Sequence, residues 1–342
     1  MIDTEFERLR LPIDGEFAIS RGARTEIETV VVRIESEGAT GIGAAAPTPR
    51  YGETADTVTA VLPDLLAAVE DVGDPLALDR IETRLGTVVR DNPAARAAVS
   101  IACHDLAATR LGVPLSRQFG LDSTSAPPTS YTVAIDDPEA MRETASAAVD
   151  DGYEVLKVKL GTDRDRERVA AVRRAAPDVT LRVDANEAWS PHEAVRKTDW
   201  LAGHGVEFVE QPVPADDPAG LGFVHDRSPL PIAADESCVT LPDVPAVADR
   251  VDIVNLKLMK CGGVREAMRM VHAARAHGLD VMLGCMVEST ASLAAACHLA
   301  PLVDYADLDG SLLLETDAYE GPSYEGGTLD VPDRPGTGVR PV

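Results

Sequence analysis

The chain has 342 residues, and 57 acidic against 32 basic residues give it a formal net charge of -25 at pH 7. This balance argues against nucleic acid or an anionic membrane surface as a partner, because both require clustered positive charge. With 45% apolar residues the chain can bury a sizeable core, which excludes wholesale disorder. The basic residues comprise 27 Arg and only 5 Lys. An acidic surface with so little lysine predicts a halophilic protein, kept soluble in high salt.

The ends of the chain and its cysteines bear on location. The N-terminal sequence MIDTEFERLR is charged and lacks the apolar segment of a signal peptide. No stretch approaches 18 uninterrupted apolar residues, so we expect no membrane span. The five cysteines are odd in number and scattered, with no C-x-x-C pair. These features predict a reduced, cytoplasmic protein.

The first part of the chain, residues 1–120, has the pattern of a small α+β unit. TVVVRIES (29–36) is rich in β-branched residues, and a glycine-bounded turn leads into a second predicted strand, GIGAAAP (41–47). Apolar residues at helical spacing predict helices over 56–70 and 93–111. The low-complexity stretch 122–128 (DSTSAPP) is typical of a linker.

From residue 121 to 315 a repeating pattern of strands and helices predicts a (β/α)7–8 TIM-type barrel. Short apolar runs end in a polar residue and alternate with helical patterns at a spacing of about 25 residues. The predicted strands are YTVAI (131–135), EVLKVKL (154–160), TLRVDA (180–185), VEFVE (206–210), LPIAAD (230–235), DIVNLK (252–257), DVMLG (280–284) and YADLD (305–309). A doubly wound sheet is the alternative, but it would require a Gly-rich phosphate loop that this sequence lacks. The tail, residues 316–342, is expected to return to the N-terminal unit.

Three successive strands carry a carboxylate at or next to their carboxyl ends: Asp184, Glu210 and Asp235. The reacting groups of such barrels lie where the strands end. Three converging carboxylates repel one another unless a cation lies between them, and a hard divalent ion such as Mg²⁺ prefers oxygen ligands. Any one of these acids alone could be an ordinary helix-capping residue. Their common register favours a metal site.

Four of the five lysines form two pairs, Lys157 with Lys159 and Lys257 with Lys260, while Lys197 lies in a charged helical stretch. Period-2 alternation points the first pair to the barrel interior. Two ammonium groups beside a divalent cation should depress each other's pKa, which makes a lysine a base near neutral pH. Amines on two faces of a metal suit proton abstraction α to a carboxylate, with the metal holding the enediolate. Inert, snorkelling lysines are the alternative.

At this point the chain resembles a known family. The motifs KVK (157–159), VDAN (183–186), VEQP (209–212), ADES (234–237) and NLKLMKCGG (255–263) are similar to the muconate-lactonizing branch of the enolase superfamily. Within it, dipeptide epimerases acting on L-Ala-D/L-Glu match best. ISRGAR (19–24), PTPRYGET (47–54), GCMVEST (284–290) and DLDG (307–310) extend the resemblance over nearly the whole chain. It implies that the N-terminal unit caps the barrel and that the tail completes the cap.

The resemblance also implies roles for individual residues. Asp184, Glu210 and Asp235 would bind one Mg²⁺ per subunit. Lys159 and Lys257 would be the acid/base pair on the two faces of the α-carbon, with Lys257 preferred over Lys260, which lies three residues beyond the strand end. Lys157 would help to neutralise the substrate carboxylate or the enediolate.

Further residues would bind the substrate. Asp307 and Asp309 would hold the free ammonium group of a dipeptide. Arg24, and less strongly Arg21, would pair with a glutamate side chain. Asn186 and Glu236 would support the metal ligands. Glu288, expected at the end of the seventh strand inside the pocket, could meet a positively charged substrate side chain or could be a loop acid bonded to backbone amides.

The resulting prediction is an isomerase that epimerises a small-molecule dipeptide and forms a homo-oligomer, without nucleic-acid or membrane partners. A muconate-type cycloisomerase or an o-succinylbenzoate synthase/N-acylamino acid racemase is the alternative, whose substrates carry no free ammonium group. A non-enzymatic acidic scaffold or metal-binding protein is a third possibility.

Overall fold

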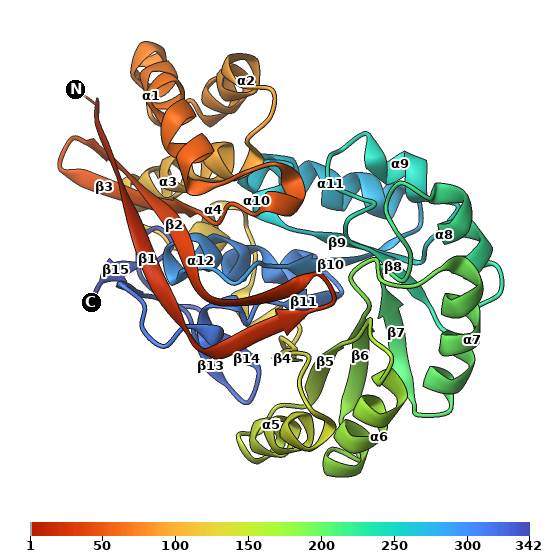
Figure 1. Ribbon diagram of the computed structural model, residues 1–342. Coiled ribbons are helices and arrows are strands. Elements are labelled where there is room, and N and C mark those ends of the chain that lie inside the picture. The colour runs from red at the N-terminus through yellow and green to blue at the C-terminus, as the bar shows by residue number, and fades with distance from the viewer. Residues whose placement is uncertain (1) are drawn as a thin grey trace.

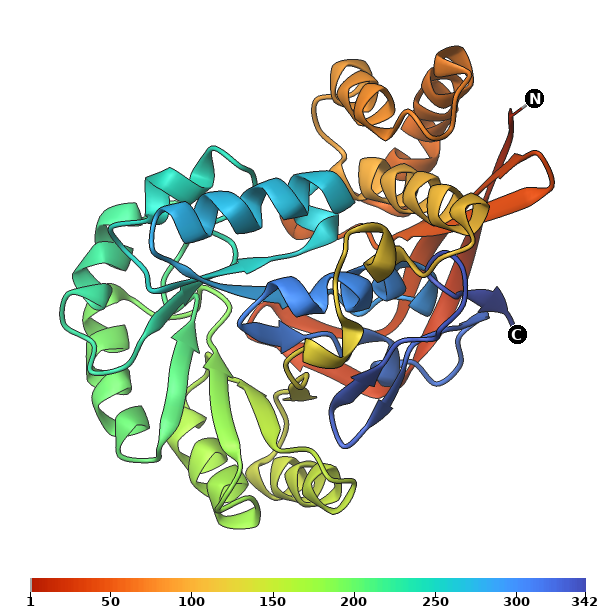
Figure 2. The ribbon, with the colours of Figure 1, turned by 180° about the vertical axis from the view of Figure 1, so that it is seen from behind.

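The computed structural model describes residues 2–342. A three-stranded antiparallel sheet and its helices lie on one side of a parallel barrel, and the tail packs beside the sheet (Figure 1). The helices α5 to α8 cover the outside of the barrel (Figure 2). No helix of the described residues combines the length and apolar character needed to span a membrane.

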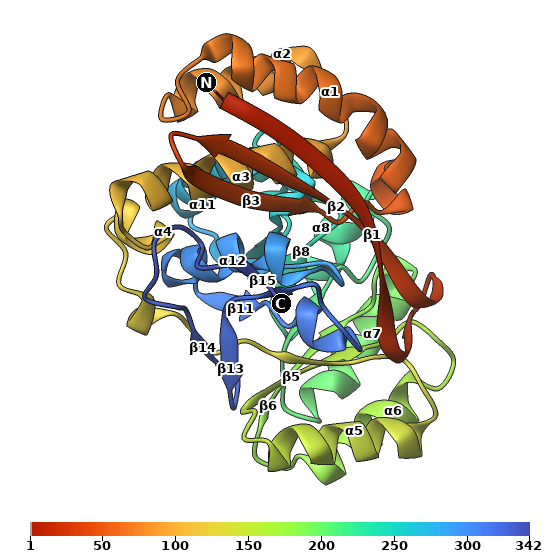
Figure 3. The same ribbon diagram turned by 90° about the vertical axis from the view of Figure 1, so that its left-hand side faces the viewer.

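The cap begins with three strands, β1 (Ile2–Ile19), β2 (Gly22–Ser36) and β3 (Ala39–Ala45), paired in that order. The strands predicted at 29–36 and 41–47 are confirmed, although β2 starts seven residues earlier. Strand β1 was not predicted, because charged residues interrupt its apolar ones along most of its length and leave no long apolar run. The β1–β2 hairpin is long and extends past the cap toward the barrel mouth (Figure 3).

Three helices complete the cap: α1 (Ala55–Val72), α2 (Leu78–Val88) and α3 (Pro93–Leu111). The first and third confirm the predictions, and α2 was not predicted. Helix α3 lies against β3 so closely that a Cβ at Gly41 would fall 2.1 Å from the Ala102 carbonyl oxygen. This backbone approach requires glycine, and it explains why α3 is rich in alanine. The short helix α4 (Leu115–Gln118) then leads out of the cap.

The barrel contains the eight predicted parallel strands in sequential order. They are β4 (Tyr131–Val133), β5 (Val155–Lys159), β6 (Thr180–Asp184), β7 (Val206–Glu210), β8 (Ile232–Ala234), β9 (Ile253–Leu256), β10 (Asp280–Gly284) and β11 (Tyr305–Asp307). The amide of Ser130 donates to the Ala306 carbonyl at 3.2 Å, which nearly closes the ring between β4 and β11. The predicted (β/α) barrel is therefore confirmed.

Helices connect successive strands. They are α5 (Pro138–Asp150), α6 (Asp165–Ala175), α7 (Pro191–Ala202), α8 (Pro218–His225), α9 (Asp243–Val247), the single turn α10 (Leu258–Cys261), α11 (Val264–Ala276) and α12 (Thr290–Leu299). Because every strand is parallel, all carboxyl ends lie on one face of the barrel, the face over which the hairpin lies.

The tail contains two short pairs, β12 (Tyr319–Glu320) with β15 (Arg340–Pro341) and β13 (Ser323–Glu325) with β14 (Thr328–Asp330). It is joined to the cap through the buried Asp105 of α3. One carboxylate oxygen of Asp105 accepts from the Thr337 amide at 2.5 Å, and the other accepts from the Ile42 amide at 2.7 Å. These contacts are those expected of a tail that returns to the N-terminal unit.

Candidate active site

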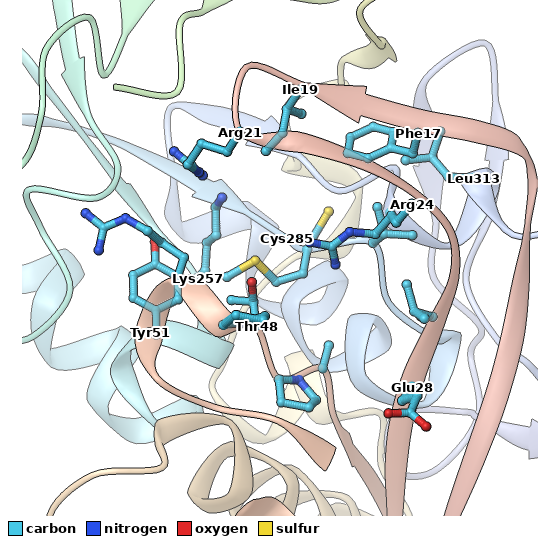
Figure 4. Close-up of a pocket in the computed structure, with 18 of the residues that line it drawn as sticks. Phe17, Ile19, Arg21, Arg24, Glu28, Thr48, Tyr51, Lys257, Cys285 and Leu313 are labelled. Carbon is cyan, nitrogen blue, oxygen red and sulfur yellow. The ribbon is translucent and has the colours of Figure 1, made fainter. Parts of the chain in front are cut away.

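A cavity of about 820 Å³ lies between the β1–β2 hairpin and the carboxyl ends of the barrel strands. The cap contributes Arg21, Arg24 and Tyr51 to its lining, and the barrel contributes Lys159, Asp235, Lys257, Asp307 and Asp309. Figure 4 shows Lys257 and Cys285 on the barrel side of this space and Arg21 and Arg24 on the hairpin. The cavity is large enough to hold a small peptide.

Three carboxylates converge at the base of this cavity. Asp184 and Glu210 are the last residues of β6 and β7 and are paired in register, and Asp235 directly follows β8. One oxygen from each lies within 4.8 Å of the others, and all three side chains are buried. The predicted convergence is confirmed. A buried set of carboxylate oxygens at this spacing has the donor chemistry that a hard divalent cation requires.

The carboxylates influence one another's ionisation. Burial and the neighbouring Asp184 raise the pKa of Glu210 to about 7. Burial also opposes ionisation of Asp184, but the ammonium groups of Lys159 and Lys157 outweigh it and lower its pKa. Positive charge beside these acids is therefore needed to keep them ionised together.

Two lysines flank the carboxylates from opposite sides. The Lys159 Nζ, at the end of β5, lies 2.7 Å from Asp184 Oδ2, and the Lys257 Nζ, just after β9, lies 2.8 Å from Asp235 Oδ2. Both line the cavity. Five successive strands thus present an amine, three carboxylates and a second amine, so a substrate between them would meet one amine on each face.

Lys157 lies beneath this arrangement and is almost fully buried. Its Nζ is 2.6 Å from Asp307 Oδ2, 2.7 Å from Glu210 Oε2 and 3.4 Å from Asp184 Oδ2. The expected lowering of the Lys157 pKa is not found. Burial alone would lower the pKa of Lys157, but Asp307, Glu210 and Asp184 raise it well above its usual value. The three carboxylates around Lys157 therefore raise its pKa by more than burial lowers it.

The two acids near the end of the chain also reach the cavity. Asp307 ends β11, pairs with Lys157 and accepts from the Ser130 hydroxyl at 2.5 Å, while Asp309 accepts from the Thr132 amide at 2.6 Å. Burial and Asp307 raise the pKa of Asp309 to about 6. Asp309 forms no ion pair within the described residues, so its carboxylate is available to a cationic group of a substrate in the cavity.

The two arginines of the hairpin have different partners. Arg21 is paired with Glu236 at 2.8 Å and Glu187 at 3.1 Å, and it donates to the Asn186 carbonyl at 2.9 Å. Arg24 lines the cavity and makes no ion pair within the described chain. Of the two predicted candidates, Arg24 therefore has the guanidinium group available for a ligand.

Of the two predicted supporting residues, Asn186 contacts a metal-ligand candidate directly, and Glu236 contacts Asn186. Asn186 donates to Asp184 Oδ1 through its amide at 2.8 Å and to Oδ2 through its side chain at 3.1 Å. Its φ of 45° is the left-handed conformation that asparagine tolerates. Glu236 lies 3.5 Å from the Asn186 side chain and pairs with Arg21. Burial and Asp235 raise the pKa of Glu236 to about 7.

Glu288 is placed differently from the sequence expectation. Strand β10 ends at Gly284, so Glu288 lies four residues beyond it and is not part of the cavity lining. It is buried, and it accepts from the Met286 amide at 3.1 Å. Burial raises its pKa to about 7. This geometry favours the loop-acid interpretation over contact with a substrate side chain.

Several residues of the site were not predicted from the sequence. Asn255 donates from Nδ2 to Glu210 Oε1 at 2.8 Å, and its spacing of two from Lys257 on one strand was a signal that could have revealed it. Ser130, Thr132 and Tyr51 carry no such signal, because only the fold brings Thr132 and Tyr51 to the cavity and Ser130 to Asp307.

The cap, the barrel and the carboxylates flanked by lysines together define an enzyme of the enolase type. Comparison with known proteins agrees: residues 2–120 match the mandelate racemase/muconate lactonizing enzyme N-terminal domain, and residues 140–342 match the enolase C-terminal domain-like family. The chain belongs to the mandelate racemase/muconate lactonizing enzyme family of the enolase superfamily.

Individual relatives are isomerases. The L-Ala-D/L-Glu epimerase of Bacteroides thetaiotaomicron is 38% identical over 327 residues, covering 95% of this chain and 84% of that protein. The dipeptide epimerase of Enterococcus faecalis V583, solved with Mg and L-Leu-L-Tyr, matches with a TM-score of 0.93 at 33% identity over 98% of both chains. The N-succinyl Arg/Lys racemase of Bacillus cereus has a TM-score of 0.94 at 27% identity, covering 99% of this chain and 95% of that one. This chain is accordingly an isomerase of the racemase and epimerase class.

Proposed function

We propose that the protein is a Mg²⁺-dependent dipeptide epimerase that inverts the C-terminal residue of a dipeptide such as L-Ala-L-Glu. The observation that carries this proposal is the placement of Lys159 and Lys257 on opposite sides of three converging carboxylates. Inversion requires one group to remove the α-proton and another to return a proton on the opposite face, and these amines have that arrangement.

Asp184, Glu210 and Asp235 would hold the Mg²⁺, since their oxygens fit a hard cation. When bound, it supplies positive charge for the anion that forms as the α-proton leaves. Relatives solved with Mg and a dipeptide support this assignment. The Lys157 ammonium, buried between Asp307 and Glu210, adds positive charge near the substrate carboxylate.

The remaining cavity residues would position the dipeptide. Asp307 and Asp309 would accept its free ammonium group, and Arg24 would pair with an acidic side chain on the residue that is inverted. One amine, Lys159 or Lys257, then removes the α-proton, and the other donates its proton from the opposite side.

The test is deuterium incorporation at the α-carbon of L-Ala-L-Glu in heavy water. Wild type should incorporate deuterium and form the epimer. Lys159→Ala and Lys257→Ala should each lower the rate of epimerisation by about 10²- to 10⁴-fold. The variant that keeps the lysine facing the α-proton of L-Ala-L-Glu should still exchange that proton for deuterium without inverting the carbon. Lys197→Ala is the control, since Lys197 lies on α7 and pairs with Glu193 of the same helix and with Asp165 of α6. Absence of exchange over a broad dipeptide panel would favour the scaffold interpretation.

A second candidate is an N-acylamino acid racemase, supported by the likeness to the N-succinyl Arg/Lys racemase. Acylation removes the positive charge from the α-nitrogen of its substrates, so they have no free α-ammonium group to pair with Asp307 and Asp309. We favour the dipeptide epimerase for this reason.

We also propose a cytoplasmic location. All five cysteines are free thiols, and four of them are buried. This is the state expected in a reducing compartment.

A further inference from the structure

The chemistry above leaves one clustered lysine without a role. Lys260 lies on α10, one turn after Lys257, yet it does not line the cavity. Its side chain is 1% exposed. The Nζ lies 2.6 Å from Asp235 Oδ1, 2.6 Å from the Asp235 carbonyl oxygen, 2.7 Å from the Asn255 carbonyl oxygen and 3.0 Å from the Cys238 carbonyl oxygen.

These contacts exclude Lys260 from proton transfer. An ammonium group has three N–H donors, and four oxygen acceptors surround this one. Every proton is engaged, and a substrate in the cavity has no path to it. Lys257 differs because it lines the cavity and contacts only a carboxylate within the described chain.

The same contacts fix the orientation of Asp235. One carboxylate oxygen, Oδ1, is held by Lys260, and the other, Oδ2, is held by Lys257. Rotation of the carboxylate would break both bonds. The backbone acceptors also belong to different segments: Asp235 and Cys238 follow β8, and Asn255 lies within β9. Lys260 therefore ties the end of β8 to the strand that carries Lys257.

Asp235 is not alone in having such a partner. Asn186 donates to both oxygens of Asp184, and Asn255 donates to Glu210 Oε1. Each of the three carboxylates is thus oriented by a neighbouring donor, and Lys260 has this place beside Asp235, where it acts together with Lys257.

We propose that Lys260 is a positioning residue that sets the orientation of Asp235 for cation binding. This inference rests on the proposed Mg²⁺ site. A compact ammonium group can donate to the four oxygens that surround the Lys260 Nζ. The larger, planar guanidinium group of an arginine cannot occupy the same position. This accounts for a lysine at position 260 in a chain that uses 27 Arg and only 5 Lys.

The experiment compares Lys260→Met and Lys260→Arg with wild type. Lys197→Met is the matched control, because it removes another lysine from a mostly buried ion pair, with Asp165, on the outside of the barrel. The readout is Mg²⁺ affinity by calorimetry in the absence of any dipeptide. We expect both Lys260 variants to bind Mg²⁺ about 10- to 100-fold more weakly, and the control to bind like wild type. At saturating Mg²⁺, KM for the dipeptide should change little.

The outcomes separate this inference from the function it rests on. Failure of wild type to bind Mg²⁺ would contradict the proposed metal site itself. Equal Mg²⁺ affinity in wild type and Lys260→Met would overturn the positioning role and leave the epimerase proposal standing.

A measurement on the wild-type protein keeps the inference testable if the variants fail to fold. With five lysines in the chain, an amine-acylating reagent followed by mass spectrometry reports on each one. Lys159 and Lys257 should react and be protected by Mg²⁺ with a dipeptide. Lys260 should stay unmodified under both conditions. If Lys260 is acylated as fast as Lys257, its amine is not held by the four oxygens as described.

Discussion

The guanidinium group of Arg50 forms two hydrogen bonds of 2.6 Å with the carboxylate of Glu187. Arg50 belongs to the 3₁₀ turn η1 (Pro49–Tyr51) of the cap, and Glu187 lies in the loop after β6, three residues beyond Asp184. Arg21 of the hairpin contacts the same carboxylate, as does the Ala215 amide at 2.9 Å. One barrel residue therefore holds two separate loops of the cap over the cavity.

Replacing this carboxylate should loosen the cap. For Glu187→Gln we expect KM for the dipeptide to rise about 5- to 30-fold, since charged hydrogen bonds between partly exposed groups contribute about 1–2 kcal/mol. Limited proteolysis of the hairpin should accelerate. Steady-state kinetics measure the first effect. Glu193→Gln, which removes a surface partner of Lys197 on α7, is the control. An unchanged KM and an unchanged cleavage rate would show that the cap is held by other contacts.

The residues of the site that lie at strand ends could be predicted from the sequence. Asp184 and Glu210 end short apolar runs, so the barrel pattern alone brings them together. Lys260 could not be assigned in this way, because its acceptors are mainly backbone carbonyls that only the folded loops supply. Glu288 was misplaced because β10 ends at Gly284 and the chain turns before reaching it.

Arg24 should determine the preference for acidic dipeptides. Arg24→Met would remove a guanidinium that has no ion-pair partner in the described chain, so the loss falls on the substrate and not on the fold. We expect kcat/KM for L-Ala-L-Glu to fall about 10- to 100-fold, and kcat/KM for L-Ala-L-Leu to change little. A panel of dipeptides measures this. An equal fall for both substrates would contradict the assignment.

Asp309 should distinguish a dipeptide from an N-acylated amino acid. Asp309→Asn keeps an oxygen for the Thr132 amide and removes the negative charge that faces the cavity. Dipeptide turnover should fall about 10- to 100-fold, and Asp307→Asn with Asp309→Asn together should abolish it. Turnover of any N-acylamino acid substrate should scarcely change. If both substrate classes lose activity equally, the acids do not bind the ammonium group.

His298 should make stability depend on pH. It is buried on α12, where its Nδ1 accepts from the Ser116 amide at 3.1 Å and its Nε2 lies 3.1 Å from the Thr337 carbonyl oxygen. This pattern requires the neutral ring, and burial lowers its pKa from 6.5 to about 4. The unfolded chain therefore binds the proton more readily, so stability falls as pH drops from about 6.5 to 4, by about 3 kcal/mol at 1.4 kcal/mol per pKa unit.

Chemical denaturation at several pH values measures this contribution. His298→Asn keeps polar atoms in the ring's place but does not titrate, so its stability should vary less than that of wild type over this range. If the difference in free energy of unfolding between wild type and His298→Asn stays constant between pH 4 and 6.5, His298 does not titrate in this range.

The excess of acidic residues should make folding depend on salt. With a net charge of -25, carboxylates on the surface repel one another more in the compact state than in the unfolded chain. Salt shortens the screening length from about 10 Å at 0.1 M to about 3 Å at 1 M. The melting temperature should therefore rise by several degrees between low and multimolar KCl. Asp64→Lys with Asp71→Lys, two exposed positions of α1, adds four units of positive charge and should raise the low-salt melting temperature and reduce its salt dependence. A melting temperature that is the same at both salt concentrations would show that the acidic surface is not an adaptation to salt.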